Sequence, residues 1–480
     1  MTLTLQDYTQ FDGLGLAELV KSGETTPREL AKTASDASAQ VNPALNAVLE
    51  IFADRLEDGG HRAIDPNAPF AGVPYLLKDI GSPEKGRLHE MGSLLFAGNI
   101  AEENGYLNLR YQQAGLTSIG RAAVPEFGMD CNTQSKANGL TRNPWNTSLS
   151  PGGSSGGGCA AVAAGVVPIA QTNDLGGSTR LPAAFCGLVG LKPTRGRVSL
   201  GPQRQDWPLG TLSEFVATRT VRDTAAVLDA VEGPGPAEVR CVVPPEGRYL
   251  ELMETPPQPL RIAFWTKSGI DVSTDPDVAA VVRDTAATLE GSGHSVEEAY
   301  HTFDYPEFQV HDGNITATLV ADALLAAREQ YPQMDFDGLE PICHDFLDRT
   351  ASLSARDLYQ SFERYNQMRT DIYRFFETYD ILLTPTSAVL PESLPAPNDF
   401  NRWARYCQFL IPPSVSGCPA ISLPMGLSRS GLPIGVQAVG RFGEDGMLLR
   451  LSRLLEQARP WADRRPAIHA ANPARAEVTA

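Results

Sequence analysis

The 480-residue sequence predicts an α/β fold. Three observations lead to this prediction: a mostly apolar run that ends in charged residues, a small-residue helix between two glycine-rich loops, and short strand-like runs near the C-terminus. Segments of this kind pack as a sheet with helices against it. The loops are then expected to gather at one edge of the sheet, where a functional site is built.

The N-terminal stretch predicts two helices, over residues 14–20 and 28–39. Thr26 has a hydroxyl that can cap the second helix, and Pro27 fits the first helical position, where no backbone N–H is needed. Both helices are expected to belong to an outer layer.

Residues 73–80, VPYLLKDI, predict a buried strand that carries polar groups at its end. Lys78 is a candidate base if apolar neighbours lower its pKa from about 10.4, because only a neutral lysine accepts a proton. The alternative is a solvated lysine at a strand end, or a partner for Asp79, which strand alternation places on the opposite face. The local sequence leaves both open.

Two glycine-rich turns flank a predicted buried helix at residues 160–165. The first turn, residues 138–158, contains Ser154, and the second, residues 173–177, is followed by Ser178. The apolar run at residues 159–170 is too short for the roughly 20 residues of a bilayer span. It therefore predicts a buried helix and no membrane anchor.

The C-terminal half predicts further helices and strands. The stretch from about Pro244 to Tyr373 is expected to be largely helical. The expected strands cover residues 261–265, 381–383, 420–423 and 434–438, and the expected amphipathic helices cover residues 275–290 and 446–459.

Composition narrows the class of protein. Apolar residues make up 42% and charged residues 20%, which is ordinary for a globular chain. A formal net charge of −17 disfavours nucleic-acid binding, because a phosphate backbone is also negative. Seven cysteines without a CxxC pair indicate reduced, buried thiols in a cytoplasmic protein, and the first ten residues do not resemble a signal peptide.

The glycines beside the two serines suit a serine hydrolase. A hydroxyl nucleophile needs a base within hydrogen-bond reach and donors for the developing oxyanion. At Asp174–Ser178, DLGGS, the glycines let successive backbone N–H groups turn toward one point. The GGSSGGG tract at residues 152–158 is compatible with a flexible linker, but it opens an apolar helix, whereas a linker joins polar surfaces.

Together these motifs resemble the amidase signature family of serine hydrolases. The resemblance rests on GGSSGG, on DLGGSTRLPAAFCGLVGLKPTRG and on the preceding PYLLKD, and the two serines are 24 residues apart (178 − 154), as in that family. It extends through ILLTPTSAVLP and SGCPAISLPMGL to RPWADRRP and is weak between about 244 and 375. It implies a mixed, twisted sheet sandwiched by helices, an αβα arrangement.

The resemblance also implies a mechanism without metal or cofactor. Lys78 matches the family's base, Ser154 the bridging serine after a cis peptide bond, and Ser178 the nucleophile that becomes acylated. The implied oxyanion donors are the backbone N–H groups of Leu175, Gly176, Gly177 and Ser178. Two departures are Thr172-Asn173, where many members carry Gly-Thr or Gly-Ser, and Ser414, where an asparagine is common; neither is expected to touch the triad.

Other motifs in the sequence indicate alternative classes of protein. Gly152-x-Ser154-x-Gly156 fits the GxSxG pattern of α/β-hydrolases, which requires a downstream histidine. The SxxK match at Ser82–Lys85 lacks its companion motifs, and neither a phosphate-binding loop nor an HExxH zinc motif is complete. The downstream histidines, none in a telling context, are His294, His301, His311, His344 and His469.

These observations predict a single domain over residues 1–480. It would have an N-terminal helical layer at about 1–65, a core at about 66–243 and 376–466, and a helical segment at about 244–375. This segment and the loop near residues 92–99 are expected to shape the pocket.

The predicted activity is hydrolysis of a small linear, aryl or cyclic amide. The combination PFAGVPYLLKD and RPWADRRP resembles the branch of cyclic amide oligomer hydrolases, of the nylon-oligomer type. Alternatives are a carbamate hydrolase with the same triad and a glutaminase subunit of an amidotransferase. No membrane partner is expected, and a homodimer is an open option.

Overall fold

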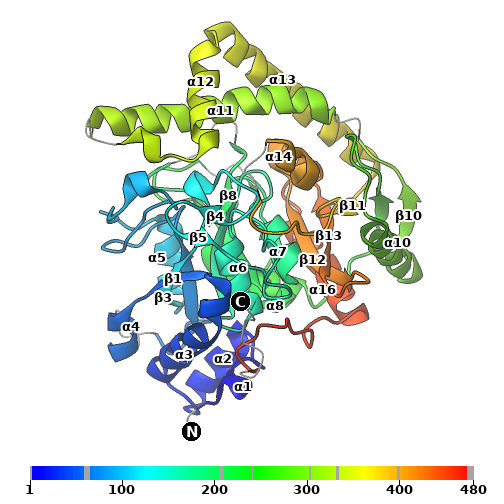
Figure 1. Ribbon diagram of the computed structural model, residues 1–480. Helices are drawn as coiled ribbons and strands as arrows, with labels where there is room; N and C mark the ends of the chain where they lie inside the picture. The colour runs from blue at the N-terminus through cyan, green and yellow to red at the C-terminus, as the bar shows by residue number, and fades with distance from the viewer. Residues whose placement is uncertain are drawn as a thin grey trace.

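The computed structural model is organised around an eleven-stranded mixed sheet (Figure 1). The structure describes residues 3–58, 65–204, 210–239, 242–301, 304–330, 335–396 and 400–472. The strand order is β1-β3-β2-β6-β8-β7-β12-β13-β11-β9-β10, and a separate two-stranded ribbon consists of β4 and β5. The strands are β1 (Val48–Ile51), β2 (Pro74–Lys78), β3 (Thr117–Ala122), β4 (Gln134–Ser135), β5 (Gly139–Leu140), β6 (Ile169–Asp174), β7 (Val189–Lys192), β8 (Ser213–Thr218), β9 (Arg261–Phe264), β10 (Ser295–Glu298), β11 (Ile381–Pro385), β12 (Ala420–Leu427) and β13 (Pro433–Gly440).

Helices flank this sheet, which confirms the predicted αβα class. One contiguous group against the sheet includes α3, α6 and α7, and another includes α8, α10 and α16. The helices are α1 (Leu5–Tyr8), α2 (Gly13–Lys21), α3 (Pro27–Leu45), α4 (Ala53–Asp58), α5 (Tyr106–Gln113), α6 (Gly156–Ala163), α7 (Arg180–Cys186), α8 (Val221–Val231), α9 (Tyr249–Leu252), α10 (Pro276–Gly291), α11 (Tyr305–Gln330), α12 (Pro341–Ser352), α13 (Ala355–Thr378), α14 (Phe400–Cys407), α15 (Ile411–Ser416) and α16 (Asp445–Ala458). Short 3₁₀ turns are η1 (Leu94–Phe96), η2 (Glu126–Gly128) and η4 (Phe336–Gly338).

The predicted start of α3 is confirmed in detail. Thr26 accepts a hydrogen bond from the backbone N–H of Glu29, and the Glu29 side chain accepts one from the backbone N–H of Thr26. This reciprocal capping box, with Pro27 at the first turn, satisfies N–H groups that have no partner inside the helix.

Three adjacent strands position the functional site. β2 runs parallel to β6, and β6 pairs antiparallel with β8. Every residue of β2 is buried, as the sequence predicted for this strand. In the β6–β8 register Asn173 faces Glu214, so polar side chains of these strands meet beside Lys78 at the end of β2.

The structure corrects three boundaries in the glycine-rich region. Helix α6 begins at Gly156, inside the glycine tract, so its three glycines belong to the helix and not to the preceding turn. The apolar run at residues 159–170 is not one buried helix, because α6 ends at Ala163 and the run continues into β6. Strand β6 extends to Asp174, so the predicted turn at Asn173 begins later. This stretch is rich in alanine and glycine throughout, so its composition does not predict where the helix ends and the strand begins.

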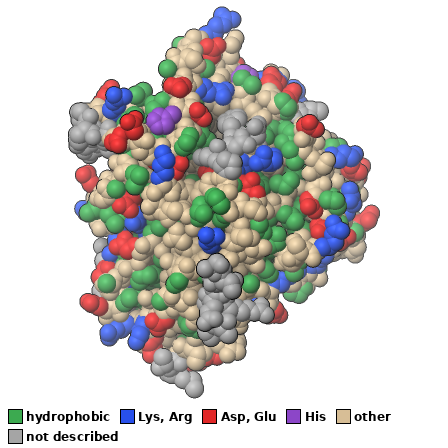
Figure 2. Space-filling model, viewed as in Figure 1, with side chains coloured by type: hydrophobic (Ala, Val, Ile, Leu, Met, Phe, Trp, Pro, Cys, Tyr) green, Lys and Arg blue, Asp and Glu red, His purple; other side chains and the backbone are tan. Residues whose placement is uncertain are grey.

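Helices α11, α12 and α13 form a layer at one end of the molecule, at the top of Figure 1. Figure 2 shows acidic and basic side chains interspersed over one face, without separation into patches of one sign. Within the described ranges, no helix combines the length and the apolar character that crossing a membrane requires. The six cysteines within these ranges are all buried and unpaired by disulfides.

Candidate active site

Lys78 ends the buried strand β2 and its amino group contacts three oxygen atoms. The Nζ atom lies 2.9 Å from Oγ of Ser154, 2.8 Å from Oγ of Ser155 and 2.6 Å from Oδ1 of Asn173. The residue is only 3% exposed, so no bulk water replaces these contacts. This arrangement resolves the question that the sequence left open, because Lys78 is neither solvated nor a partner of Asp79, whose carboxylate binds Arg121.

Burial is the main electrostatic influence on Lys78. It lowers the pKa of the amino group to about 7, against opposing contributions from Glu214, Cys159 and Asp174. Desolvation disfavours the charged form of a lysine, and the neighbouring oxygens are not enough to restore the usual value. A large fraction of Lys78 is therefore neutral near pH 7, as a general base requires.

Two loops bring Ser154 and Ser178 to the same cavity. Ser154 follows a cis peptide bond from Gly153, as the family resemblance implied, and is 2% exposed. Ser178 lies between β6 and α7 and is half-buried. The backbone N–H of Ser155 donates to the carbonyl oxygen of Ser178 at 3.2 Å, which ties the loops together. Among the hydrogen bonds of the described residues, none joins the two hydroxyl groups directly.

Asp174 and Arg180 form a fully buried ion pair that braces the turn before Ser178. Arg180 donates to both carboxylate oxygens of Asp174, at 2.7 and 2.8 Å. Burial tends to raise the pKa of Asp174, but Arg180 and the surrounding hydrogen bonds outweigh it and lower that pKa overall. The pair is held in turn by Gln437 and Ser414, which accept hydrogen bonds from the guanidinium at 2.6 and 3.0 Å.

The turn contains the four predicted oxyanion donors, and they are not equivalent. The N–H of Gly177 already donates to Oδ1 of Asp174 at 2.8 Å. Within the described residues, no hydrogen bond occupies the N–H groups of Leu175, Gly176 or Ser178. Gly177 has φ +127°, and a Cβ there would lie 2.3 Å from Leu410, so this turn requires glycine.

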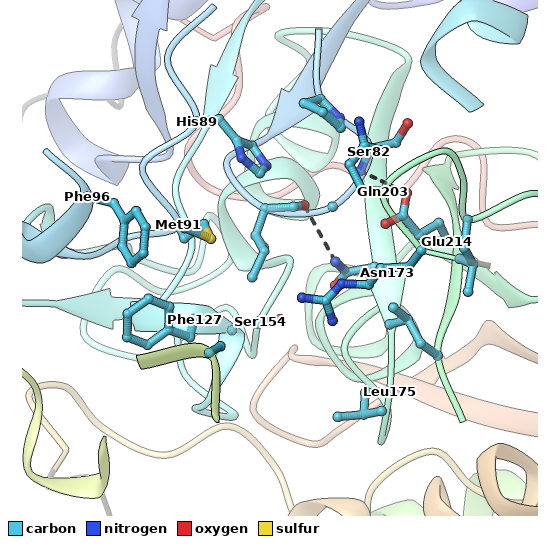
Figure 3. A pocket seen from close by; sticks show the side chains of 18 of the residues that line it. Ser82, His89, Met91, Phe96, Phe127, Ser154, Asn173, Leu175, Gln203 and Glu214 are labelled. Carbon is cyan, nitrogen blue, oxygen red and sulfur yellow. Dashed lines mark hydrogen bonds between the residues drawn. The ribbon is translucent and has the colours of Figure 1, made fainter. Parts of the chain in front are cut away.

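Ser154 and Ser178 both line a cavity of about 560 Å³. Figure 3 shows this cavity from close by. Phe96, Met91 and Phe127 lie together at one side of this view, whereas Glu214 and Ser82 lie at the other. Helix α11 covers the cavity with Leu319, Val320, Ala323 and Leu324, and the loop at residues 92–99 contributes Phe96 and Asn99.

Glu214 is a buried carboxyl group in the wall of this cavity. It is 5% exposed, and its Oε2 accepts a hydrogen bond from the backbone N–H of Ser82 at 2.9 Å. Burial raises the pKa of Glu214 to about 7, although the Ser82 N–H, Lys78 and Arg204 act in the opposite direction.

The structure brings Lys78 and Ser154 into direct contact and places Ser178 beside them at the cavity. The expectation that neither family departure touches the triad is wrong for Asn173, which accepts a hydrogen bond from Lys78. Ser414, by contrast, accepts a hydrogen bond from Arg180, which braces the turn before Ser178. Sequence reasoning missed the contact of Ser155 with Lys78 and the place of Glu214 in the cavity wall; the paired serines of GGSSGG were the one available signal for Ser155.

The histidine that a GxSxG hydrolase needs is not found among the described residues that line this cavity. Among the described residues that line it, the only histidine is His89, which precedes Ser154 in the chain. The downstream histidines have other neighbours; His294 accepts from Leu260, for example, and His311 contacts Ser361. No three His, Cys, Asp or Glu side chains of the described ranges are grouped in a way that could hold a metal ion.

Comparison with known proteins identifies relatives along the whole chain. The model of the Amidase family matches residues 29–449. The chain is 35% identical over 489 residues to a 6-aminohexanoate-cyclic-dimer hydrolase of Pseudomonas sp. (strain NK87), covering 97% of each protein. It is 30% identical to an acylamidase of Rhodococcus erythropolis, over 97% of this chain and 99% of the relative. A solved structure of 6-aminohexanoate cyclic dimer hydrolase complexed with substrate superimposes with a TM-score of 0.90 at 34% identity, over 96% of this chain and 99% of that one.

Proposed function

The chain belongs to the amidase signature family and is a hydrolase of amide C–N bonds, and on this premise we propose that Lys78, Ser154 and Ser178 form its catalytic triad. In this proposal Ser178 is the nucleophile, Ser154 relays the proton and Lys78 is the base. The reaction then passes through an acyl-enzyme on Ser178.

The contact between Lys78 and Ser154 carries the proposal. A neutral amine has two N–H donors and one lone pair, whereas the side-chain oxygen of Asn173 can only accept. If Lys78 donates to Asn173 and to Ser155, its lone pair is left for the hydroxyl proton of Ser154. This hydrogen-bond direction makes Ser154 Oγ the acceptor for the next proton, which comes from Ser178.

Acylation follows from these positions. Ser178 Oγ attacks the scissile carbonyl carbon while its proton passes to Ser154, whose own proton passes to Lys78. The resulting lysine ammonium returns a proton through Ser154 to the amide nitrogen, the C–N bond breaks, and the amine leaves. Water then attacks the acyl-enzyme with the same two groups as base and relay, and the carboxylic acid is released.

The backbone of the turn at residues 174–178 stabilises the oxyanion in this proposal. The N–H groups of Leu175, Gly176 and Ser178 supply the donors, because the Gly177 N–H is engaged by Asp174. Donors fixed in advance by the Asp174–Arg180 pair need no rearrangement when negative charge develops, which is the most effective form of electrostatic catalysis.

For the substrate we propose amides of intermediate size with apolar groups beside the carbonyl, cyclic oligomers among them. The cavity of about 560 Å³ has room for such molecules, and most of its lining is apolar. The 6-aminohexanoate-cyclic-dimer hydrolase and the acylamidase among the relatives support this class. A carbamate presents the same carbonyl to the same groups, and glutamine would be the substrate of an amidotransferase subunit.

One substrate panel tests the proposal. Purified enzyme is given an anilide, an aliphatic amide, a cyclic amide dimer, an aryl carbamate and glutamine, and the released acids and amines are quantified. The proposal predicts the highest kcat/KM for the apolar or cyclic amides and loss of turnover in Ser178→Ala. Preference for the carbamate would identify a carbamate hydrolase, and preference for glutamine would identify a glutaminase.

A further inference from the structure

The cavity has two chemically different ends. Phe96, Phe127 and Met91 form an apolar end, whereas Ser82 and Glu214 lie at a polar end (Figure 3). The proposed mechanism uses the middle of the cavity and assigns no role to the carboxyl group of Glu214. A buried carboxyl group in a binding cavity is costly to ionise without a partner, so its presence there calls for a ligand or a structural explanation.

The residues packed around Glu214 engage one of its two carboxylate oxygens. Oε2 accepts the N–H of Ser82, which accounts for one oxygen. An ideal Cβ on Gly81 would lie 2.8 Å from Oε1 of Glu214 and 3.1 Å from Nδ2 of Asn173, so the glycine makes room for both side chains. Among the hydrogen bonds of the described residues, none reaches Oε1.

The charges around the cavity favour a positive ligand. Its described lining contains three carboxylates, of Glu102, Glu103 and Glu214, but only one permanent cation, Arg204. Burial lowers the pKa of His89, so this histidine adds no charge at neutral pH. The net charge of −17 also raises the local concentration of cations near the protein.

We propose that Glu214 is a specificity-determining residue that binds a protonated primary amine of the substrate at the polar end of the cavity. The inference rests on the proposed amide hydrolysis and names a feature of its substrate. Ammonium N–H groups donate to Oε1, while the apolar end receives the hydrocarbon portion on the other side of the scissile bond. A charge-assisted hydrogen bond in a water-poor site is worth about ten- to hundredfold in binding.

The preference for a charged substrate should increase with pH. The charged and titratable groups that face Glu214 are Lys78 of β2, Arg204 of the loop before β8, and Tyr111 of α5. Burial raises the pKa of Glu214 to about 7, so the free carboxyl group loses its proton between about pH 6 and pH 8. An alkylamine stays protonated over this range. Both substrates depend on Lys78 in the same way, so dividing the rate for the charged amide by the rate for the neutral amide removes the effect of the Lys78 titration.

Three amides of nearly equal length test the inference. N-Butylpentanamide is neutral, 5-amino-N-butylpentanamide carries the ammonium on the acyl side, and N-(4-aminobutyl)pentanamide carries it on the leaving side. The inference predicts that wild-type enzyme processes one of the charged amides with a kcat/KM at least about tenfold above that of the neutral amide. The ratio should grow from pH 6 to pH 8.

The matched variant is Glu214→Gln, which keeps an oxygen acceptor for Ser82 but removes the charge. It should abolish the charged-to-neutral preference and make the ratio of the two kcat/KM values independent of pH, with the neutral amide serving only as the reference in that ratio. Glu18→Gln, an exposed carboxylate on α2, is the control and should keep the wild-type ratio. If wild-type enzyme turns over the neutral amide as well as both charged amides, or if Glu214→Gln keeps the wild-type preference, the inference is overturned and the proposed function still stands. Failure of all three amides while an amide of the substrate panel is turned over would also overturn the inference, and failure of every amide would instead contradict the proposed function.

Discussion

The side-chain oxygen of Asn173 accepts a hydrogen bond from Nζ of Lys78 at 2.6 Å, the shortest of the three contacts that this amino group makes with side chains. Asn173 belongs to β6 and Lys78 to the parallel neighbour β2, so the sheet fixes the two residues relative to one another. The contact orients the amine toward Ser154 without adding a charge. A neutral acceptor at this position is what allows burial to lower the pKa of Lys78.

Replacing Asn173 by aspartate should therefore lower the fraction of Lys78 that is neutral at pH 7. A carboxylate next to Nζ stabilises the ammonium form, and at the distance seen here it should raise the pKa of Lys78 by about 1–2 units. The acidic limb of the kcat/KM profile would move upward by the same amount, and turnover at pH 7 would fall. The control is Asn366→Asp, an exposed change on α13 that should leave the profile in place. An unshifted limb in Asn173→Asp would show that Lys78 is not the group that titrates.

The adjacent serines of the glycine tract provide a matched pair of variants. Both hydroxyls contact Lys78 at nearly the same distance, but the proposal uses only Ser154 as a relay. Ser154→Ala should lower kcat by about 10²–10⁴-fold, the range for loss of a proton-transfer group, with water partly replacing the bridge. Ser155→Ala should cost much less. Equal losses in the two variants, measured on the same anilide, would contradict the assignment of the relay.

The buried pair of Asp174 and Arg180 should be important for stability. Both side chains are fully buried, so Arg180→Met leaves an uncompensated carboxylate inside the protein. The expected loss in the free energy of unfolding is about 3–5 kcal/mol, measured by urea denaturation. Arg429→Met removes an exposed partner of Asp277 and should change it by no more than about 1 kcal/mol. A similar small effect in Arg180→Met would mean that the turn before Ser178 is braced by other contacts.

Lys78 should also make stability depend on pH. Its pKa is about 7 in the folded protein and about 10.4 in an unfolded chain, so between these values the unfolded state binds more protons. The stability of the wild type therefore rises as pH increases from about 7 to 10, by up to about 4 kcal/mol from this group. Lys78→Met lacks this contribution.

The free energy of unfolding of Lys78→Met minus that of the wild type should consequently decrease as the pH increases from about 7 to 10. Lys21→Met, on the exposed side of α2, should show a difference that is independent of pH. A constant difference for Lys78→Met as well would contradict the lowered pKa.

Much of this arrangement could be predicted from the sequence because the signals are local. The buried strand that ends in Lys78, the cap of α3 at Thr26, and the turns before Ser154 and Ser178 each follow from neighbouring residues. The start of α6 at Gly156 could not, because glycine normally disfavours helices and only close packing of this segment against residues 122–123 explains it.

Contacts between distant segments were harder to foresee. Asn173 is 95 residues from Lys78, and it reaches Nζ only because of the register in which β6 lies beside β2. Glu214 enters the cavity wall through the antiparallel register of β8 with β6. A single sequence does not specify either register, so the roles of these two residues depend on the structure.

The most direct test of the account is to locate the acyl group. Enzyme mixed with a slowly hydrolysed anilide is acid-quenched within the first turnover, digested and analysed by mass spectrometry. The account predicts an acyl adduct, at most one per chain, that fragmentation of the peptide assigns to Ser178, and none in Ser178→Ala. An adduct on Ser154, or full labelling of Ser178→Ala by the same substrate, would contradict the assignment of Ser178 as the nucleophile.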